Sequence, residues 1–226
     1  MHQSLESHGF FPSDHIYKAF SKMEYALDFV DRGRFRFGAL ATYKNIEDAN
    51  RRDNSEGVGS FRTPGNVTSV HFDKNDLDST YATEAPGYVN VHTELGNPVY
   101  VFSTSLSTVS IQFLAEKFGR YIVQIDNPKE LADQITHHLK TRTEKFAGGI
   151  EGVSVSYNAG EVIEESLNNF ERTTLSYSQK PVSFSSECEF RFVSINIDSP
   201  ENRMNSDYMN IDLGGPVKYA RLLADT

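Results

Sequence analysis

The alternation of apolar and polar residues predicts that the chain opens with a strand, a helix and a second strand. Residues 15–20 (HIYKAF) have the composition of a short strand, and the apolar residues that follow recur at helical spacing. Ser21 with Glu24 three positions later forms a capping-box pattern at the predicted helix start, and Gly33 is suited to end this helix. Residues 34–40 (RFRFGAL) alternate as a half-buried strand does.

The rest of the chain predicts more strands than helices, and the two kinds of element do not alternate strictly. Further strands are predicted at residues 67–72, 88–92, 99–103, 121–125, 153–157, 190–195, 208–213 and 217–222. Further helices are predicted at residues 108–118 with Ser107 as N-cap, from Asn127-Pro128 to about residue 140, and at residues 161–170. Loops rich in Gly, Pro, Ser, Asn or Asp are predicted at residues 54–66, 76–87 and 200–206. This order indicates one α+β domain over residues 1–226 rather than a doubly wound parallel sheet.

Charge and cysteine content exclude several classes of protein. The formal net charge is −9, from 22 Lys and Arg against 31 Asp and Glu, which disfavours broad binding to nucleic acid or anionic lipid. No apolar run reaches the roughly 20 residues of a membrane-spanning helix, and the N-terminus lacks the pattern of a secretory signal. The single Cys188 excludes an internal disulfide framework and a cysteine-based zinc site. We therefore expect a cytoplasmic protein that has neither a membrane segment nor a metal site.

A pair of carboxylates precedes the predicted strand at residues 190–195. Glu187 and Glu189 are two positions apart, and residues at this spacing share a face in an extended segment. We therefore expect both side chains to point the same way, which suits general acid/base work or stabilisation of a developing positive charge. The alternative is the polar face of an edge strand, on which Arg191 also forms salt bridges.

Three hydroxyl groups lie at the end of one predicted strand, and a cation lies within another predicted strand. Ser103, Thr104 and Ser105 stand where a strand ends and a helix follows, so their side chains can hold ribose, phosphate or amide groups. They can equally cap the helix, because Ser and Thr are favoured N-caps. Lys18, next to Tyr17 in the first predicted strand, can bind phosphate or a ribose hydroxyl, or it is a solvated strand residue.

The order of these three motifs resembles the ADP-ribosyltransferase superfamily, in the branch marked by a basic residue, S-T-S and E-x-E. The matching positions are Lys18, Ser103-Thr104-Ser105 and Glu187-Cys188-Glu189. The opening segment IYKAFSKMEYALDFVDRGRFRF also resembles the strand–helix–strand start of that superfamily.

A second set of sequence segments is similar to an uncharacterised bacterial family that often accompanies phage-defence genes: IYKAF, VFSTS, GRYIVQID, VSYNAGE and KPVSFSSECEFRF.

The first strand departs from the pattern of the ADP-ribosyltransferase branch. That branch usually has Arg followed by Gly in the first strand, where this chain has Lys18-Ala19. The change removes a bidentate cation and the room for close backbone approach to nicotinamide.

The resemblance implies an α+β fold of two small packed β-sheets with flanking helices, and NAD as the substrate. Glu189 is then the carboxylate that accepts from the ribose 2′-OH and stabilises the oxocarbenium-like state, and Glu187 positions or deprotonates the nucleophile. Lys18 with Tyr17, and the S-T-S hydroxyls at residues 103–105, are expected to hold NAD.

The resemblance also predicts how a second substrate is recognised. Residues 175–186 are expected to form a target-recognition loop, with Tyr177 and Phe184 as its contact aromatics. The expected acceptor is a macromolecule, a protein or a nucleic acid, and E-x-E indicates a guanidinium group as the target.

A toxin-like role in conflict between phage and host is implied, with an antitoxin or inhibitor as a further partner. Hydrolysis of NAD in place of transfer stays open. The alternative from another class is a catalytically inactive module of the same fold that binds a nucleotide or a protein. A nuclease is disfavoured, because the chain is acidic and lacks paired metal ligands.

Overall fold

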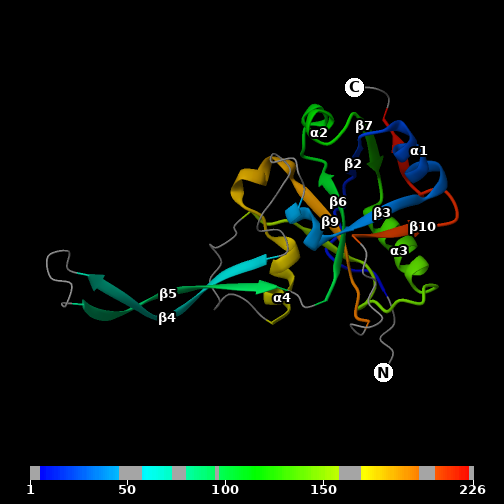
Figure 1. Cartoon of the computed structure of the whole chain (residues 1–226). Helices are drawn as coiled ribbons and strands as arrows, with labels where there is room; N and C mark the ends of the chain where they lie inside the picture. The colour runs from blue at the N-terminus through cyan, green and yellow to red at the C-terminus, as the bar shows by residue number, and fades with distance from the viewer. Residues whose placement is uncertain are drawn as a thin grey trace.

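A computed structural model describes residues 6–45, 58–72, 80–94, 97–157, 169–198 and 207–223 (Figure 1). The helices are α1 (Met23–Arg32), α2 (Ile111–Lys117), α3 (Pro128–Leu139) and α4 (Asn169–Ser178), with the 3₁₀ helices η1 (Leu40–Asn45) and η3 (Val182–Glu187). The strands are β1 (His8–Gly9), β2 (Ile16–Phe20), β3 (Arg34–Ala39), β4 (Val58–Phe72), β5 (Thr80–Glu94), β6 (Val99–Leu106), β7 (Tyr121–Ile125), β8 (Glu151–Ser154), β9 (Glu189–Ile195), β10 (Tyr208–Asp212) and β11 (Ala220–Leu222). The predicted α+β class is confirmed.

Most of the strands form one mixed sheet that branches. Its main order is β1-β8-β9-β6-β2-β7-β11, in which β1 and β8 are parallel and the other neighbours antiparallel. β2 pairs with β6 through Ile16 and Tyr17, whereas β3 pairs with β6 through Gly38 and Ala39 and carries β10 on its other edge. The strands were expected to form two small packed sheets, but the pairing instead links them into one sheet whose two groups diverge from β6.

The sheet has a separate apolar core on each face, because side chains alternate along a strand. Ile16 and Phe102 belong to one core, which α1 and α3 cover. Val101 packs with Tyr177 of α4 on the other face, where Tyr17 packs against α2. We call the surface that carries Ile16 and Phe102 the α1 face, and the surface that carries Tyr17 and Val101 the α4 face.

Several element boundaries follow the residues that predicted them. β2, β3 and β7 match their predicted strands to within one residue at each end. α1 ends at Gly33, which adopts the left-handed conformation with φ 64°. α3 begins at Pro128, and the side chain of Asn127 accepts from the backbone N–H of Glu130. These starts and stops depend on local chemistry, which explains their agreement with the sequence.

Two predicted helix caps are wrong. Lys22 is the N-cap of α1 and makes no capping hydrogen bond through its side chain, so the capping box at Ser21 does not form. α2 is capped by Ser110 rather than Ser107. The reason is that β6 continues to Leu106 and a turn follows it, which delays the start of the helix.

The late strands appear close to their predicted positions. β9 begins one residue before the predicted strand at residues 190–195. β8 begins two residues before and ends three residues before the strand predicted at 153–157. β10 and β11 fall within the segments predicted at 208–213 and 217–222. The predicted loop at 200–206, and all but the last two residues of the helix predicted at 161–170, lie outside the described residues; those two residues begin α4.

Two long strands replace much of two predicted loops. β4 and β5 pair antiparallel along their whole length, although residues 54–66 and 76–87 were predicted as loops. Pro64 and Pro86 indicated chain breaks there, but both strands of this two-stranded sheet are edge strands, which tolerate proline. The hairpin projects away from the branched sheet (Figure 1). The ends of the two predictions, at residues 54–57 and 76–79, lie outside the described residues.

The base of the hairpin is held by α4 and the residues that follow it. The backbone N–H of Ser60 donates to Gln179 Oε1 at 2.9 Å. Gly59 lies so close to the helix that an added Cβ would stand 2.5 Å from Leu175 Cβ and 2.7 Å from the backbone nitrogen of Ser176. Only glycine therefore permits this approach of β4 to α4.

Gly59→Ala is expected to loosen the hairpin from α4 and to destabilise the fold by about 1–3 kcal/mol, the usual cost of forcing extra atoms into a packed contact. Thermal unfolding, together with limited proteolysis of the hairpin, measures the effect. Gly215→Ala is the matched control, because a Cβ at Gly215 meets nothing within 4 Å. Equal stability of the two variants would contradict the close approach.

Candidate active site

The three strands that carry the sequence motifs are neighbours in the sheet. β6 lies between β2 and β9, and the register pairs Tyr17 with Ser105 and Ser105 with Glu189. Residues that lie opposite one another on adjacent strands project from the same face. Tyr17, Ser105 and Glu189 therefore form a row across the α4 face, which we call the Tyr17–Glu189 row.

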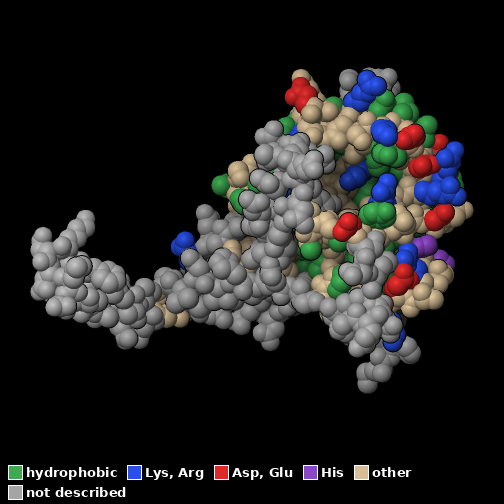
Figure 2. Space-filling model, in the orientation of Figure 1, with side chains coloured by type: hydrophobic (Ala, Val, Ile, Leu, Met, Phe, Trp, Pro, Cys, Tyr) green, Lys and Arg blue, Asp and Glu red, His purple; other side chains and the backbone are tan. Residues whose placement is uncertain are grey.

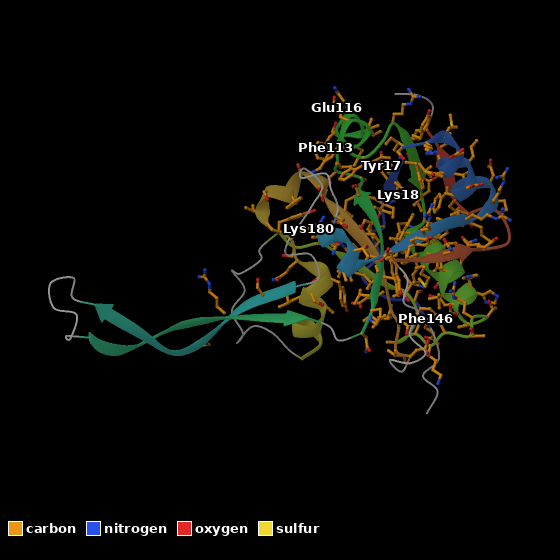
Figure 3. The ribbon with its side chains drawn as sticks, viewed as in Figure 1. Tyr17, Lys18, Phe113, Glu116, Phe146 and Lys180 are labelled. Atoms are coloured by element: carbon orange, nitrogen blue, oxygen red, sulfur yellow. The ribbon has the colours of Figure 1, made fainter. Side chains whose placement is uncertain are left out.

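Lys18 lies on the other face of the sheet. Its Nζ is 4.6 Å from the centre of the Phe102 ring, which belongs to the α1 face, and it donates to the Ser103 carbonyl oxygen at 2.7 Å. The motif match predicted that Lys18 and Glu189 share one cleft, and the structure separates them. A shift of one residue along a strand reverses the face, so a match by position leaves open whether Tyr17 or Lys18 faces the site. Figure 3 labels both residues on β2.

The S-T-S segment divides between the two faces. Ser105 belongs to the Tyr17–Glu189 row, and Ser103 lies opposite Arg191 on the same face. Thr104 projects to the α1 face, where it is buried and donates to the Phe190 carbonyl oxygen at 2.8 Å. The two serines are thus beside Glu189 in the sheet, whereas Thr104 stabilises the pairing of β6 with β9.

Glu187 and Glu189 converge through a turn instead of an extended segment. Glu187 ends η3, Cys188 adopts a left-handed conformation with φ 43°, and Glu189 opens β9. Both carboxylates nevertheless reach one cation, with Lys180 Nζ 2.9 Å from Glu187 Oε2 and 2.8 Å from Glu189 Oε2. A non-glycine residue at positive φ costs about 1–3 kcal/mol, and such residues concentrate at functional sites.

Five charged side chains form a network of ion pairs around this turn, which we call the charged cluster: Lys117, Lys180, Glu187, Glu189 and Arg191. Lys117 Nζ lies 2.8 Å from Glu187 Oε1, and Arg191 Nε lies 2.8 Å from Glu189 Oε1. Glu187 and Glu189 are each 5% exposed, and Arg191 is 1% exposed. Removing a charge from water costs several kcal/mol per ion, which close pairing offsets, so the charged cluster is a candidate functional site as well as a structural feature.

Sequence analysis missed the two lysines of the charged cluster. A usable signal existed for Lys180, because it is the nearest cation before E-x-E and Arg191 is the nearest after it. Because buried carboxylates require cationic partners, the cations that flank E-x-E in the sequence are candidates to pair with Glu187 and Glu189. Lys117 comes from α2, and no sequence pattern connects that helix with β9.

The environment keeps Glu189 ionised. Burial opposes ionisation of this carboxyl, but the adjacent charges of Arg191 and Lys180 outweigh burial and hold its pKa well below the ordinary range. The hydroxyl oxygen of Tyr157 accepts from the backbone N–H of Glu189 at 2.7 Å, and burial raises the pKa of Tyr157 to about 12. Glu189 is therefore an ionised carboxylate paired with two cations, and Tyr157 beside it is a neutral phenol at physiological pH.

The two predicted contact aromatics lie in different surroundings. Phe184 is half-buried on η3, with its ring centre 5.6 Å from Lys117 Nζ and 5.3 Å from Lys180 Nζ. Tyr177 is 1% exposed, and its hydroxyl donates to Glu151 at 2.7 Å, so it does not reach a macromolecule from this position. Residues 175–186 form the end of α4 and most of η3 instead of one open loop.

Acid is expected to weaken the fold through Glu189. The pKa of this group is depressed in the folded state, so its contribution to stability is present above the unfolded pKa of about 4.3 and is lost as pH falls toward the lower folded value. Urea unfolding between pH 6 and pH 3 measures the slope. A Glu189→Leu/Arg191→Met protein, which lacks the titrating group, should lose less stability over this window; an identical slope would contradict the assignment.

Comparisons with known proteins give no relative from which a role for the site could be inferred. No family model, no curated protein and no solved structure matches this chain. Among the described residues, no group of three or more His, Cys, Asp or Glu side chains is arranged to hold a metal ion. Within the same ranges, every helix is too short or too polar to cross a membrane.

Proposed function

We propose that this chain is an NAD-cleaving ADP-ribosyltransferase, or an NAD glycohydrolase, with an ADP-ribosyltransferase-like fold and its site at the Tyr17–Glu189 row. The observation that carries the proposal is the register that aligns Tyr17, Ser105 and Glu189 from three segments distant in the sequence. The branching of the sheet at β6, into the strands that follow β2 and those that follow β3, stands in place of the two separate sheets that the resemblance implies. Lys18 is not part of this proposed site.

The proposed reaction begins with loss of nicotinamide. The bond between the nicotinamide nitrogen and ribose C1′ breaks, the electron pair leaves with nicotinamide, and positive charge spreads over C1′ and the ring oxygen. Glu189 accepts a hydrogen bond from the ribose 2′-OH and stabilises that charge, in the manner of the second carboxylate of retaining glycosidases. The ionised state that Arg191 and Lys180 enforce on Glu189 is the state that this role requires.

Glu187 completes the proposed reaction. It takes the proton of the attacking group, either water or an acceptor side chain, as the new bond to C1′ forms. Its carboxylate already lies 2.9 Å from Lys180 and 2.8 Å from Lys117, which position it beside Glu189. Phe184, on the partly exposed η3 segment, is the proposed contact for a macromolecular acceptor with a guanidinium group. A toxin-like role, with an inhibitor protein as partner, belongs to the same proposal.

A second candidate, binding of a nucleotide or a protein without cleavage, is favoured by the contacts of Glu189. Arg191 donates to both of its oxygens, at 2.8 and 3.1 Å, and Lys180 lies 2.8 Å from one of them. A ribose hydroxyl must displace or share one of these charged partners. The Lys18-Ala19 departure from the catalytic pattern points in the same direction.

Incubation of the full chain with NAD labelled in nicotinamide tests both candidates. Release of nicotinamide by the wild-type chain, lost in Glu189→Gln, supports the catalytic function. Thermal stabilisation by NAD without release supports binding alone. Equal release by both proteins would remove Glu189 from the mechanism. The absence of both release and stabilisation would reject cleavage and binding of NAD and favour binding of a protein.

A further inference from the structure

A cavity of ≈ 420 Å³ opens where β2 and β3 diverge from β6, and residues of α1 and β10 also line it. Its volume lies within the range of small-molecule sites. Aromatic rings from three different elements line it: Phe20 of β2, Tyr25 of α1 and Phe102 of β6. The cavity lies where β2 and β3 both leave β6. These two strands do not pair with each other, so a space remains between them.

The lining is locally positive on an acidic protein. Lys18, Arg34 and Arg36 line the cavity together with Asp28 and Asp212, so their formal charges sum to +3 − 2 = +1, whereas the whole chain carries −9. The two carboxylates are engaged in ion pairs. Asp212 Oδ2 lies 3.0 Å from Arg34 Nε, and Asp28 pairs with a neighbouring arginine outside the cavity. Figure 2 shows blue and red side chains interspersed over this side of the molecule.

Two of the cations stand at different depths. Lys18 is part-buried against the Phe102 ring, and Arg36 is exposed and stacks on Tyr208, with its guanidinium carbon 4.9 Å from the ring centre. A guanidinium at a rim presents a planar fork that matches a phosphate group bidentately, and an ammonium acts as a point charge deeper in a site. Aromatic rings in the same lining suit a flat ring.

We propose that this cavity binds a planar aromatic ring that carries one phosphate group, as in a nucleoside monophosphate. The phosphate lies at Arg36, and the ring enters between Tyr25, Phe20 and Phe102 toward Lys18. The site is separate from the Tyr17–Glu189 row, because Tyr17, Ser105 and Glu189 are not among the residues that line the cavity. It therefore does not depend on cleavage of NAD.

Calorimetric titration of the full chain with three probes tests the chemistry: adenosine monophosphate, adenosine and inorganic phosphate. The monophosphate should bind at least tenfold more tightly than either fragment, because it alone satisfies both the rings and the cations. Equal affinity for inorganic phosphate would mean that charge alone attracts the ligand, and equal affinity for adenosine would remove the phosphate contact; either result overturns the proposal, as does the absence of binding.

Matched variants then locate the site. Lys18→Met and Arg36→Gln should each weaken binding of adenosine monophosphate by at least tenfold, and Arg36→Gln carries little risk to the fold because Arg36 is exposed. Arg221→Gln is the control, since Arg221 is exposed and pairs with Asp126 outside the cavity. Equal weakening by all three substitutions would overturn the proposal. Glu189→Gln should leave this affinity unchanged, which separates failure of the cavity from failure of the proposed catalytic function.

Discussion

Replacement of Glu189 by Gln is expected to lower nicotinamide release from NAD by about 10²–10³-fold, the usual cost of removing one preorganised electrostatic contact to a transition state. The side chain keeps its size and still accepts one hydrogen bond from Arg191 through its amide oxygen, but it no longer stabilises the positive charge on ribose. Binding of NAD should change much less than turnover, since the lost interaction is strongest in the transition state. Single-turnover release and calorimetric titration separate the two effects.

Glu151→Gln is the matched control for this prediction. Glu151 is also a buried glutamate in the same sheet, but its carboxyl accepts from Tyr177 and lies outside the Tyr17–Glu189 row. The control protein should release nicotinamide at the wild-type rate to within a few-fold. Equal loss in both variants would mean that any buried carboxyl in this region is required for folding, and the catalytic role of Glu189 would be rejected.

Arg191→Met is expected to reduce the free energy of unfolding by about 3–5 kcal/mol, because it leaves the buried carboxylate of Glu189 without its closest guanidinium partner. Arg191 donates to both carboxylate oxygens and to the Tyr177 carbonyl oxygen at 2.9 Å, so its removal also leaves a buried acceptor unpaired. Urea unfolding at neutral pH measures the loss.

The double variant Glu189→Leu/Arg191→Met distinguishes the ion pair from the packing around it. Apolar residues of similar volume remove both buried charges together, and such replacements are often neutral for stability. The double variant should therefore be more stable than Arg191→Met alone, although it lacks the proposed catalytic carboxylate. Additive losses from the two substitutions would show that Glu189 and Arg191 do not depend on each other.

Local signals in the sequence predicted much of the fold. Gly33 ends α1 and Asn127-Pro128 starts α3, because left-handed backbone and side-chain capping are properties of a few neighbouring residues. The strand at β7 was predicted to the residue. Of the hairpin, residues 67–72 of β4 and 88–92 of β5 were predicted as strands. Most of the rest was predicted as loop, since its prolines and glycines resemble loop residues and the partner of each strand lies outside any local window.

The candidate site was predictable in its residues and not in its geometry. The sequence indicated Glu187, Glu189 and the serines, but it could not determine that Cys188 turns the chain between the two carboxylates. It also could not fix whether Tyr17 or Lys18 faces Glu189, because alternation along a strand is known only once the register is known. Lys117 joins the charged cluster from a helix that no motif links to it.

A crystal structure of the full chain with an uncleavable NAD analogue tests the division of the sheet into two faces most directly. The nicotinamide ribose should lie within hydrogen-bonding distance of Glu189 on the α4 face, beside Tyr17 and Ser105, with Lys180 or Arg191 displaced from the carboxylate. A dinucleotide bound only in the Lys18 cavity, with the charged cluster unchanged, would contradict the proposed site of NAD cleavage.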